Sequence, residues 1–296
     1  MVVLFGSAAN AAPPVTDAWR ELTIAALGAA VGVLLTLIVV VVAFLHGNGL
    51  SSPSSEPGPA TEQPIKRQGT QRGLPASGIA PELLQALMEA RRSVMPKNMT
   101  GNLLRPEHVK AILASAPWAP NHGKTEPWRF TVFGGDAKAK LLDWTLKWYR
   151  SRPASFWKEN FVLSSGVPEF ADAEAFSNYY TKAAGDKWGR ASHLVAISVR
   201  RQRPEAGKKQ HPEWEETCAV ACAVQNMHLL ATSLQVGAYW SSWYAHYRAS
   251  DECVRDLGLD PAAGDRCLGV FVLGEQEPNL SNRASRLPLE QIATWQ

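Results

Sequence analysis

Residues 214–234 read WEETCAVACAVQNMHLLATSL, and this stretch decides how the rest of the chain is interpreted. Apolar and small side chains surround the predicted helix on nearly every side, and a few polar residues such as Gln225 and His228 interrupt them. A helix of that composition is buried on all sides, at the centre of a domain or at a subunit interface. Gly237 marks the helix end, and residues 236–243 (VGAYWSSW) predict a strand.

Shorter patterns on either side of this helix predict the other elements. Helices are predicted at 81–92, 106–116 and 137–149, and strands at 128–133, 193–199 and 267–273. Pro81 and Pro106 suit the first turn of a helix, where the missing N–H costs no hydrogen bond. Continuous apolar runs are typical of strands that are buried on both faces. Together the patterns predict an α+β domain in which helices surround a mixed sheet.

The first 45 residues of the chain include a long apolar stretch, which the rest of the chain lacks. Residues 22–45 (LTIAALGAAVGVLLTLIVVVVAFL) carry no charge and are long enough to cross a hydrocarbon core of about 30 Å. The mean hydropathy of the whole chain is only −0.16, which excludes several spans. We therefore predict an N-terminal flank (1–21), a transmembrane helix (22–45), a disordered Pro/Gly/Ser linker (46–80) and a globular domain (81–296).

The apolar stretch is interpreted as an uncleaved anchor, because it exceeds the length of about 7–15 residues typical of a signal peptide core. A cleaved signal peptide is the alternative. The predicted localisation is a single-pass membrane protein. Arg20 precedes the stretch, and the next basic residues lie well beyond its other end, so the charges leave the side of the membrane open.

Composition excludes several other classes of protein. The net charge of +3 comes with scattered basic residues, which gives no case for nucleic-acid binding. Four cysteines are too few for a disulfide framework, and Cys218 and Cys222 are expected to be small core residues. No Cys or His cluster at metal-ligand spacing accompanies them, so no metal site is predicted. The usual dinucleotide, phosphate-loop, zinc-protease and hydrolase motifs are also missing.

Three polar clusters remain as candidate sites. Arg91, Arg92 and Ser93 stand at the end of the first predicted helix, and two guanidinium groups beside a hydroxyl suit a phosphate. Residues 119–128 (APNHGKTEPW) combine two prolines with polar side chains ahead of a strand. At the third cluster, residues 240–242, an indole stands beside two hydroxyls. Taken singly, such clusters are more often a helix cap, a decorated turn and a Trp packed in the core.

The order and spacing of these clusters resemble the nitroreductase family of flavoproteins over residues 81–296. The shared features are the RRS at 91–93, the AP-x-H loop that ends in PW, the PEWE segment at 212–215 and the Trp-centred strand tip. The resemblance implies an intertwined homodimer with FMN at the subunit interface. It also implies a set of cofactor-binding residues, which are Arg91, Arg92, Ser93, Trp118, His122, Trp240, Ser241, Ser242 and Arg286.

The resemblance further implies an oxidoreductase in which NAD(P)H reduces FMN, and the flavin then reduces a small nitroaromatic or quinone-like acceptor in a ping-pong cycle. No side chain is then required as acid or base, and the cytosolic face is favoured for access to NAD(P)H. Met95 stands where the family often has a basic residue, and Lys97 or Lys124 could supply that charge. Residues 152–190, rich in aromatic side chains, are the candidate lid.

Two other functions stay open. TEPW at 125–128, PLEQI at 288–292 and an N-terminal anchor also resemble iodotyrosine deiodinase, a reductive dehalogenase. That enzyme needs a Glu, a Tyr and a Lys in its lid, and these cannot be placed within 136–190. The second alternative is a membrane-tethered flavin-binding protein without turnover, which the departure at Met95 suggests.

Overall fold

A four-stranded antiparallel sheet in the order β1-β2-β4-β3 lies at the centre of the structure. The structure, a computed structural model, describes residues 78–161, 169–186, 188–204, 210–278, 280 and 284–296. Its strands are β1 (Trp128–Gly134), β2 (His193–Val199), β3 (Val236–Ser241) and β4 (Arg266–Glu275). Its α-helices are α2 (Pro81–Ala90), α3 (Pro106–Ser115), α4 (Ala137–Arg150), α5 (Ala154–Asn160), α6 (Ala173–Asp186), α7 (Glu213–Ser233), α8 (Ala245–Arg248) and α9 (Asp251–Asp256). Short 3-10 turns are η1 (Pro96–Asn98), η2 (Ala116–Trp118), η3 (His122–Lys124), η4 (Trp188–Arg190), η5 (Pro261–Ala263) and η6 (Leu289–Gln291).

Local sequence patterns predicted the four strands and the helices α2, α3, α4 and α7, whereas α5, α6, α8 and α9 were not predicted. β2 coincides with the predicted strand at 193–199, and α7 follows the long apolar stretch almost residue for residue. α2 and α3 begin at Pro81 and Pro106, as expected from the position of the two prolines. One helix end differs from the prediction. α2 ends at Ala90, because Arg91 takes extended dihedral angles (φ −58, ψ 126), so the two arginines follow the helix instead of forming its last turn.

All three strand pairs of the described sheet are antiparallel, and this corrects the mixed sheet predicted from the sequence. The prediction rested on the apolar runs of β2 and β4, and such runs indicate only that both faces of a strand are buried. Strand direction depends instead on how the connections return the chain to the sheet. The α+β class itself is confirmed by these elements.

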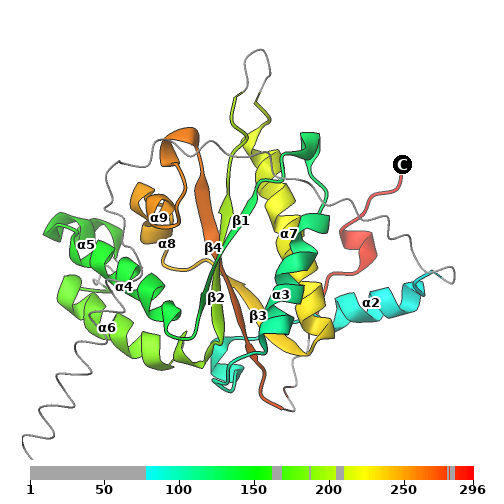
Figure 1. Cartoon of the computed structure of the whole chain (residues 1–296), viewed down its shortest axis with the longest axis horizontal. Coiled ribbons are helices and arrows are strands. Elements are labelled where there is room, and N and C mark those ends of the chain that lie inside the picture. Colours follow the sequence, from blue (N-terminus) through cyan, green and yellow to red (C-terminus); the bar gives the residue numbers. More distant parts are fainter. Residues whose placement is uncertain (1–77, 162–168, 187, 205–209, 279, 281–283) are drawn as a thin grey trace, which may run out of the picture. The chain divides into compact units, whose positions relative to one another are not determined.

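Helices cover both faces of the sheet (Figure 1). On one face, α3 and α7 pack over Val195, Ile197 and Val199 of β2. On the other face, Leu194 and Ala196 of the same strand join an aromatic-rich core to which α4, α5, α6, α8 and α9 contribute. Because successive side chains of a strand point to opposite faces, one central strand supplies both cores.

Within the described residues, exposed apolar side chains gather on three segments in particular. The exposed residues are Trp214, Cys218, Ala221 and Cys222 on α7, Leu83, Leu84 and Met88 on α2, and Leu287, Leu289, Ile292 and Trp295 near the C-terminus. The prediction that α7 is buried on all sides is therefore wrong for the isolated chain, as is the core position expected for the two cysteines. We call the exposed residues Trp214, Cys218, Ala221 and Cys222 the apolar stripe of α7. Exposed apolar patches mark interaction sites, so this stripe favours a position of α7 at a subunit interface over one at the centre of the domain.

The predicted single-pass membrane localisation is wrong. Among the residues that the structure describes, no helix is both long and apolar enough to pass through a bilayer. α7 has 21 residues, but Glu213, Glu215 and Glu216 lie in its first turn. Residues 1–77, which contain the predicted flank, the predicted span and most of the predicted linker, lie outside the described residues. The division of the chain at residues 21, 45 and 80 stays a prediction.

Candidate functional site

The segment that carries Arg91, Arg92 and Ser93 is attached to the edge of the sheet. The main-chain N–H of Val94 donates to the oxygen of Ala238 in β3 across 3.0 Å. Nε2 of the buried His228 on α7 donates to the main-chain oxygen of Arg92 across 2.9 Å. Because β3 is an edge strand of the described sheet, these two bonds hold the arginine segment along that edge. Ser93 is exposed between them.

Arg286 comes from the far end of the chain and joins the first two arginines. Partial burial lowers the pKa of Arg91, and the positive charges of Arg286 and then Arg92 lower it further. Nη1 of Arg92 also donates to the oxygen of Arg91 across 2.8 Å, which orients its guanidinium group. The positive charges of Arg286 and Arg92 act on Arg91, and an anion such as phosphate bound there would offset this repulsion. We call Arg91, Arg92 and Arg286 the arginine cluster.

The tip of β3 lies on the same edge as the arginine cluster. Trp240 is partly exposed and donates from Nε1 to the oxygen of Leu268 across 3.2 Å. The hydroxyl of Ser241 is buried and accepts from the N–H of Trp243 across 3.1 Å, while Ser242 is exposed. Gly269 permits this packing, because a Cβ atom there would lie 2.4 Å from the oxygen of Ser241. The tip therefore presents an indole and one free hydroxyl position.

The loop residues Trp118 and His122 lie at a different place. Trp118 ends η2 with 68% of its surface exposed, and His122 begins η3, where its Nδ1 lies 2.7 Å from Oε2 of Glu215. The strand register places the start of β1 and the tip of β3 at the same end of the sheet. They stand on opposite edges, however, and these edges are separated by about 14 Å across the sheet, for three strand spacings of about 4.8 Å.

The predicted site residues thus form two groups within one chain. The β3-edge group contains Arg91, Arg92, Ser93, Trp240, Ser241, Ser242 and Arg286, and the loop group contains Trp118 and His122. Met95 lies two residues after Ser93 and is exposed, and Lys97 lies two residues further on in η1. Lys124 belongs to the loop, where it takes a positive φ of 54.

Sequence reasoning missed two structural contributors. In the sequence, His228 is a polar interruption of an apolar helix, and in the structure it holds the arginine segment in place. Glu216 lies in the first turn of α7 and is almost wholly buried, in an ion pair with Arg201. Polar residues on an otherwise apolar helix were the available signal, because a buried polar group needs a partner.

The candidate lid at 152–190 contains α5 and α6, and its residues 162–168 and 187 lie outside the described part of the chain. Trp157, Phe176 and Tyr180 of this segment are buried in the aromatic core. The ring of Phe176 stacks on that of Tyr149 of α4 with centroids 4.3 Å apart. These aromatic side chains therefore serve packing, and the role of the segment as a lid stays a prediction.

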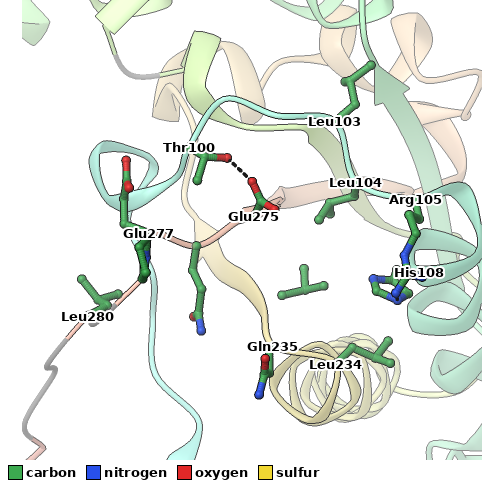
Figure 2. A pocket seen from close by; sticks show the side chains of 13 residues that line it. Thr100, Leu103, Leu104, Arg105, His108, Leu234, Gln235, Glu275, Glu277 and Leu280 are labelled. Carbon is green, nitrogen blue, oxygen red and sulfur yellow. Dashed lines mark hydrogen bonds between the residues drawn. The ribbon is translucent and has the colours of Figure 1, made fainter.

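A cavity of about 770 Å³ lies where β3 begins and β4 ends. It shares Gln235, Val236, Gln276 and Leu280 with a smaller cavity that Arg92 also lines. Figure 2 shows Thr100 and Glu275 facing each other on one side of it, and Leu234 and Gln235 from the end of α7 on another. The Glu275 carboxylate accepts hydrogen bonds from Thr100 and Asn102, which lower its pKa. Arg105 and His108 contact each other, with Nη2 and Nε2 2.7 Å apart. Since these polar groups bond one another, we place the candidate site at the β3 edge.

Comparisons with known proteins agree with this fold. A family model described as "Nitroreductase family" matches residues 88–275. A nitroreductase-like family protein from Bacillus cereus superposes with a TM-score of 0.51 at 19% identity, covering 72% of this chain and 95% of that one. The FMN-dependent nitroreductase NfnB from Mycobacterium smegmatis, in complex with NADPH, gives 0.50 at 15% identity, covering 73% and 98%. No curated protein matches the chain.

Proposed function

The chain belongs to the nitroreductase family, and from this premise we propose that it is an FMN-dependent oxidoreductase. In this proposal NAD(P)H is the electron donor, and a small nitroaromatic or quinone-like compound is the acceptor. The two substrates react in turn by a ping-pong mechanism. The observation that carries the proposal is that the positive charges of Arg286 and Arg92 act on the partly buried Arg91, which favours binding of an anion at this edge of the sheet.

The residues of the β3 edge fit FMN in chemical type. The arginine cluster would hold the phosphate, with the exposed hydroxyl of Ser93 as a further donor. The exposed face of Trp240 and the hydroxyl of Ser242 lie further along the strand and would meet the ring system. When bound, FMN supplies the redox chemistry by accepting a hydride at N5 and passing electrons on. The protein binds and orients the reactants and excludes water, so no acid or base residue is proposed.

A homodimer would complete the site. Trp118 and His122 stand on the opposite edge of the sheet from the arginine cluster, so one chain does not bring the two groups to one ligand. Apolar side chains are exposed on α7 (Trp214, Cys218, Ala221 and Cys222), on α2 and on the C-terminal segment. We propose that this surface packs against a second copy, whose loop then supplies Trp118 and His122 to the flavin.

An anaerobic reduction experiment tests the function directly. The purified full-length protein should carry a flavin absorbance, and NADPH should bleach it rapidly without oxygen. Addition of a nitroarene or a quinone should restore the absorbance. A flavin that stays oxidised with both NADH and NADPH would contradict the enzyme assignment and leave a flavin-binding protein without turnover. Turnover of 3-iodotyrosine by dithionite-reduced protein, without nitroarene turnover, would favour the dehalogenase instead.

A further inference from the structure

His122 contacts two residues that the proposed function does not use. Its Nδ1 lies 2.7 Å from Oε2 of Glu215, and Nδ1 of His211 lies 3.9 Å from the same oxygen. The two imidazole rings have centroids 4.2 Å apart. One potential ligand atom of each residue lies within 4.8 Å of those of the other two. Two imidazoles and a carboxylate from two distant segments therefore converge on one point.

The chemistry of this cluster suits zinc or a similar divalent transition metal. Zn²⁺ binds imidazole nitrogen and carboxylate oxygen at about 2.0–2.2 Å, so neighbouring ligands of a tetrahedral site stand about 3.4 Å apart. The two measured separations, 2.7 and 3.9 Å, lie on either side of that spacing. Side-chain exposures of 65% for His122 and 22% for Glu215 allow small rotations and leave a position open to water.

Two part-buried hydrogen bonds hold the main chain of His211, and a buried ion pair holds the residue next to Glu215. Nη2 of Arg201 donates to the main-chain oxygen of His211 across 3.0 Å, and the N–H of His211 donates to the side chain of Gln202 across 3.2 Å. Arg201 is itself paired with the buried Glu216, which directly follows Glu215 in the first turn of α7. Such outer contacts orient metal ligands and limit the rearrangement on binding.

The third ligand is brought in by a close backbone contact. Gly123 directly follows His122, and a Cβ atom at that position would lie 2.4 Å from Nε2 of His211. Gly123 also has a positive φ of 59, which favours glycine. The loop can therefore approach the His211 ring closely, and this approach places His122 over Glu215.

We propose that His122, His211 and Glu215 form a binding site for Zn²⁺ or a similar divalent transition metal. The bound metal would attach the loop at 119–127 to the start of α7. The sequence predicted no metal site, because His122 lies 89 positions before His211. The role is independent of FMN. It gives the loop, which the proposed function places against the flavin of the partner subunit, a fixed position on its own chain.

Calorimetric titration of the tag-free, full-length protein with ZnCl₂, after chelator treatment, tests the proposal. We expect one saturable site per chain, and binding at least about tenfold weaker in each of H122A, H211A and E215Q. His108→Ala and Glu213→Gln are the matched controls, because the first removes a surface imidazole and the second neutralises a carboxylate in the same helical turn. Both controls should bind Zn²⁺ like the wild type, and excess MgCl₂ should not displace the zinc.

Thermal unfolding supplies a second readout and identifies any variant that does not fold. Zn²⁺ should raise the Tm of the wild type and both controls by mass action, and should not raise the Tm of E215Q, whose side chain keeps its shape. The proposal would be overturned if the wild type showed no saturable zinc binding. It would also be overturned if all three ligand variants bound zinc with the affinity of the wild type. The flavin absorbance of the same samples reports separately on the proposed function.

Discussion

Nε2 of His228 donates a hydrogen bond to the main-chain oxygen of Arg92 across 2.9 Å, joining residues that are 136 positions apart. The imidazole is buried on α7, and the segment it holds carries two of the three guanidinium groups of the arginine cluster. Burial lowers the pKa of His228, while this hydrogen bond acts in the opposite direction and the charge of Arg91 lowers the pKa further. The folded protein therefore favours a neutral His228.

The stability of the protein should depend on pH through His228. Above about 6.5, the ordinary pKa of histidine, both folded and unfolded chains hold it neutral. As the pH falls from there toward the lower folded pKa, the unfolded chain binds a proton that the folded chain excludes, so the free energy of unfolding should fall. Urea denaturation at about pH 7.5 and at several lower pH values measures this loss. His228→Gln, which keeps an N–H donor but does not titrate, should lose less stability over the same range, and equal losses would contradict the prediction.

Removing Arg286 should weaken FMN binding without destabilising the flavin-free protein. Arg286→Ala removes a charge-assisted phosphate contact of about 1.5–3 kcal/mol, which corresponds to roughly a 10- to 150-fold rise in the Kd for FMN. The same change relieves repulsion on Arg91, so the Tm of the apoprotein should stay constant or rise. Fluorescence titration with FMN and thermal unfolding give the two values. Arg255→Ala, in an exposed pair with Asp251 on α9, is the control and should change neither.

The buried ion pair between Arg201 and Glu216 should be critical for stability. Nε and Nη groups of arginine need acceptors when buried, and here Arg201 is 9% and Glu216 2% exposed. Glu216→Leu leaves an unpaired guanidinium and should lower the free energy of unfolding by about 3–5 kcal/mol. The double variant R201M/E216L should recover part of that loss. Urea denaturation at one fixed protein concentration gives the free energy of unfolding of the wild type, of R201M and E216L, and of the double variant. If the losses of the two single variants simply added up in the double variant, the two side chains would not be coupled.

A charge on the exposed stripe of α7 should dissociate the proposed dimer. Ala221 lies on that stripe between Cys218 and Cys222, and Ala221→Glu would place a carboxylate in an apolar interface. Light scattering coupled to size-exclusion chromatography should show a dimer for the wild type and a monomer, or a much weaker dimer, for the variant. Flavin binding should weaken together with dimerisation. Ala139→Glu on the exposed side of α4 is the control and should leave the dimer intact. An unchanged dimer in A221E would show that the interface does not include the stripe on α7.

Much of the fold was readable from local patterns in the sequence. The apolar run at 193–199 became β2 with the same bounds, and Pro81 and Pro106 marked the starts of α2 and α3. Strand direction was not readable, because apolar runs indicate burial and carry no information on how a strand pairs. The exposed stripe on α7 could not be predicted either, because an apolar helix can bury its sides against its own chain or against another.

The sequence by itself identified a candidate phosphate site, because Arg91, Arg92 and Ser93 stand together along the chain, and the family resemblance implied that the phosphate belongs to FMN. Only the tertiary structure decided which residues share a site. It brought Arg286 to Arg91, and it brought His122 to Glu215 at the opposite edge of the sheet. The physical reason is the range of the interactions. Helix and strand propensities act over a few residues, whereas contacts between charged groups depend on which surfaces meet when the sheet and its helices pack.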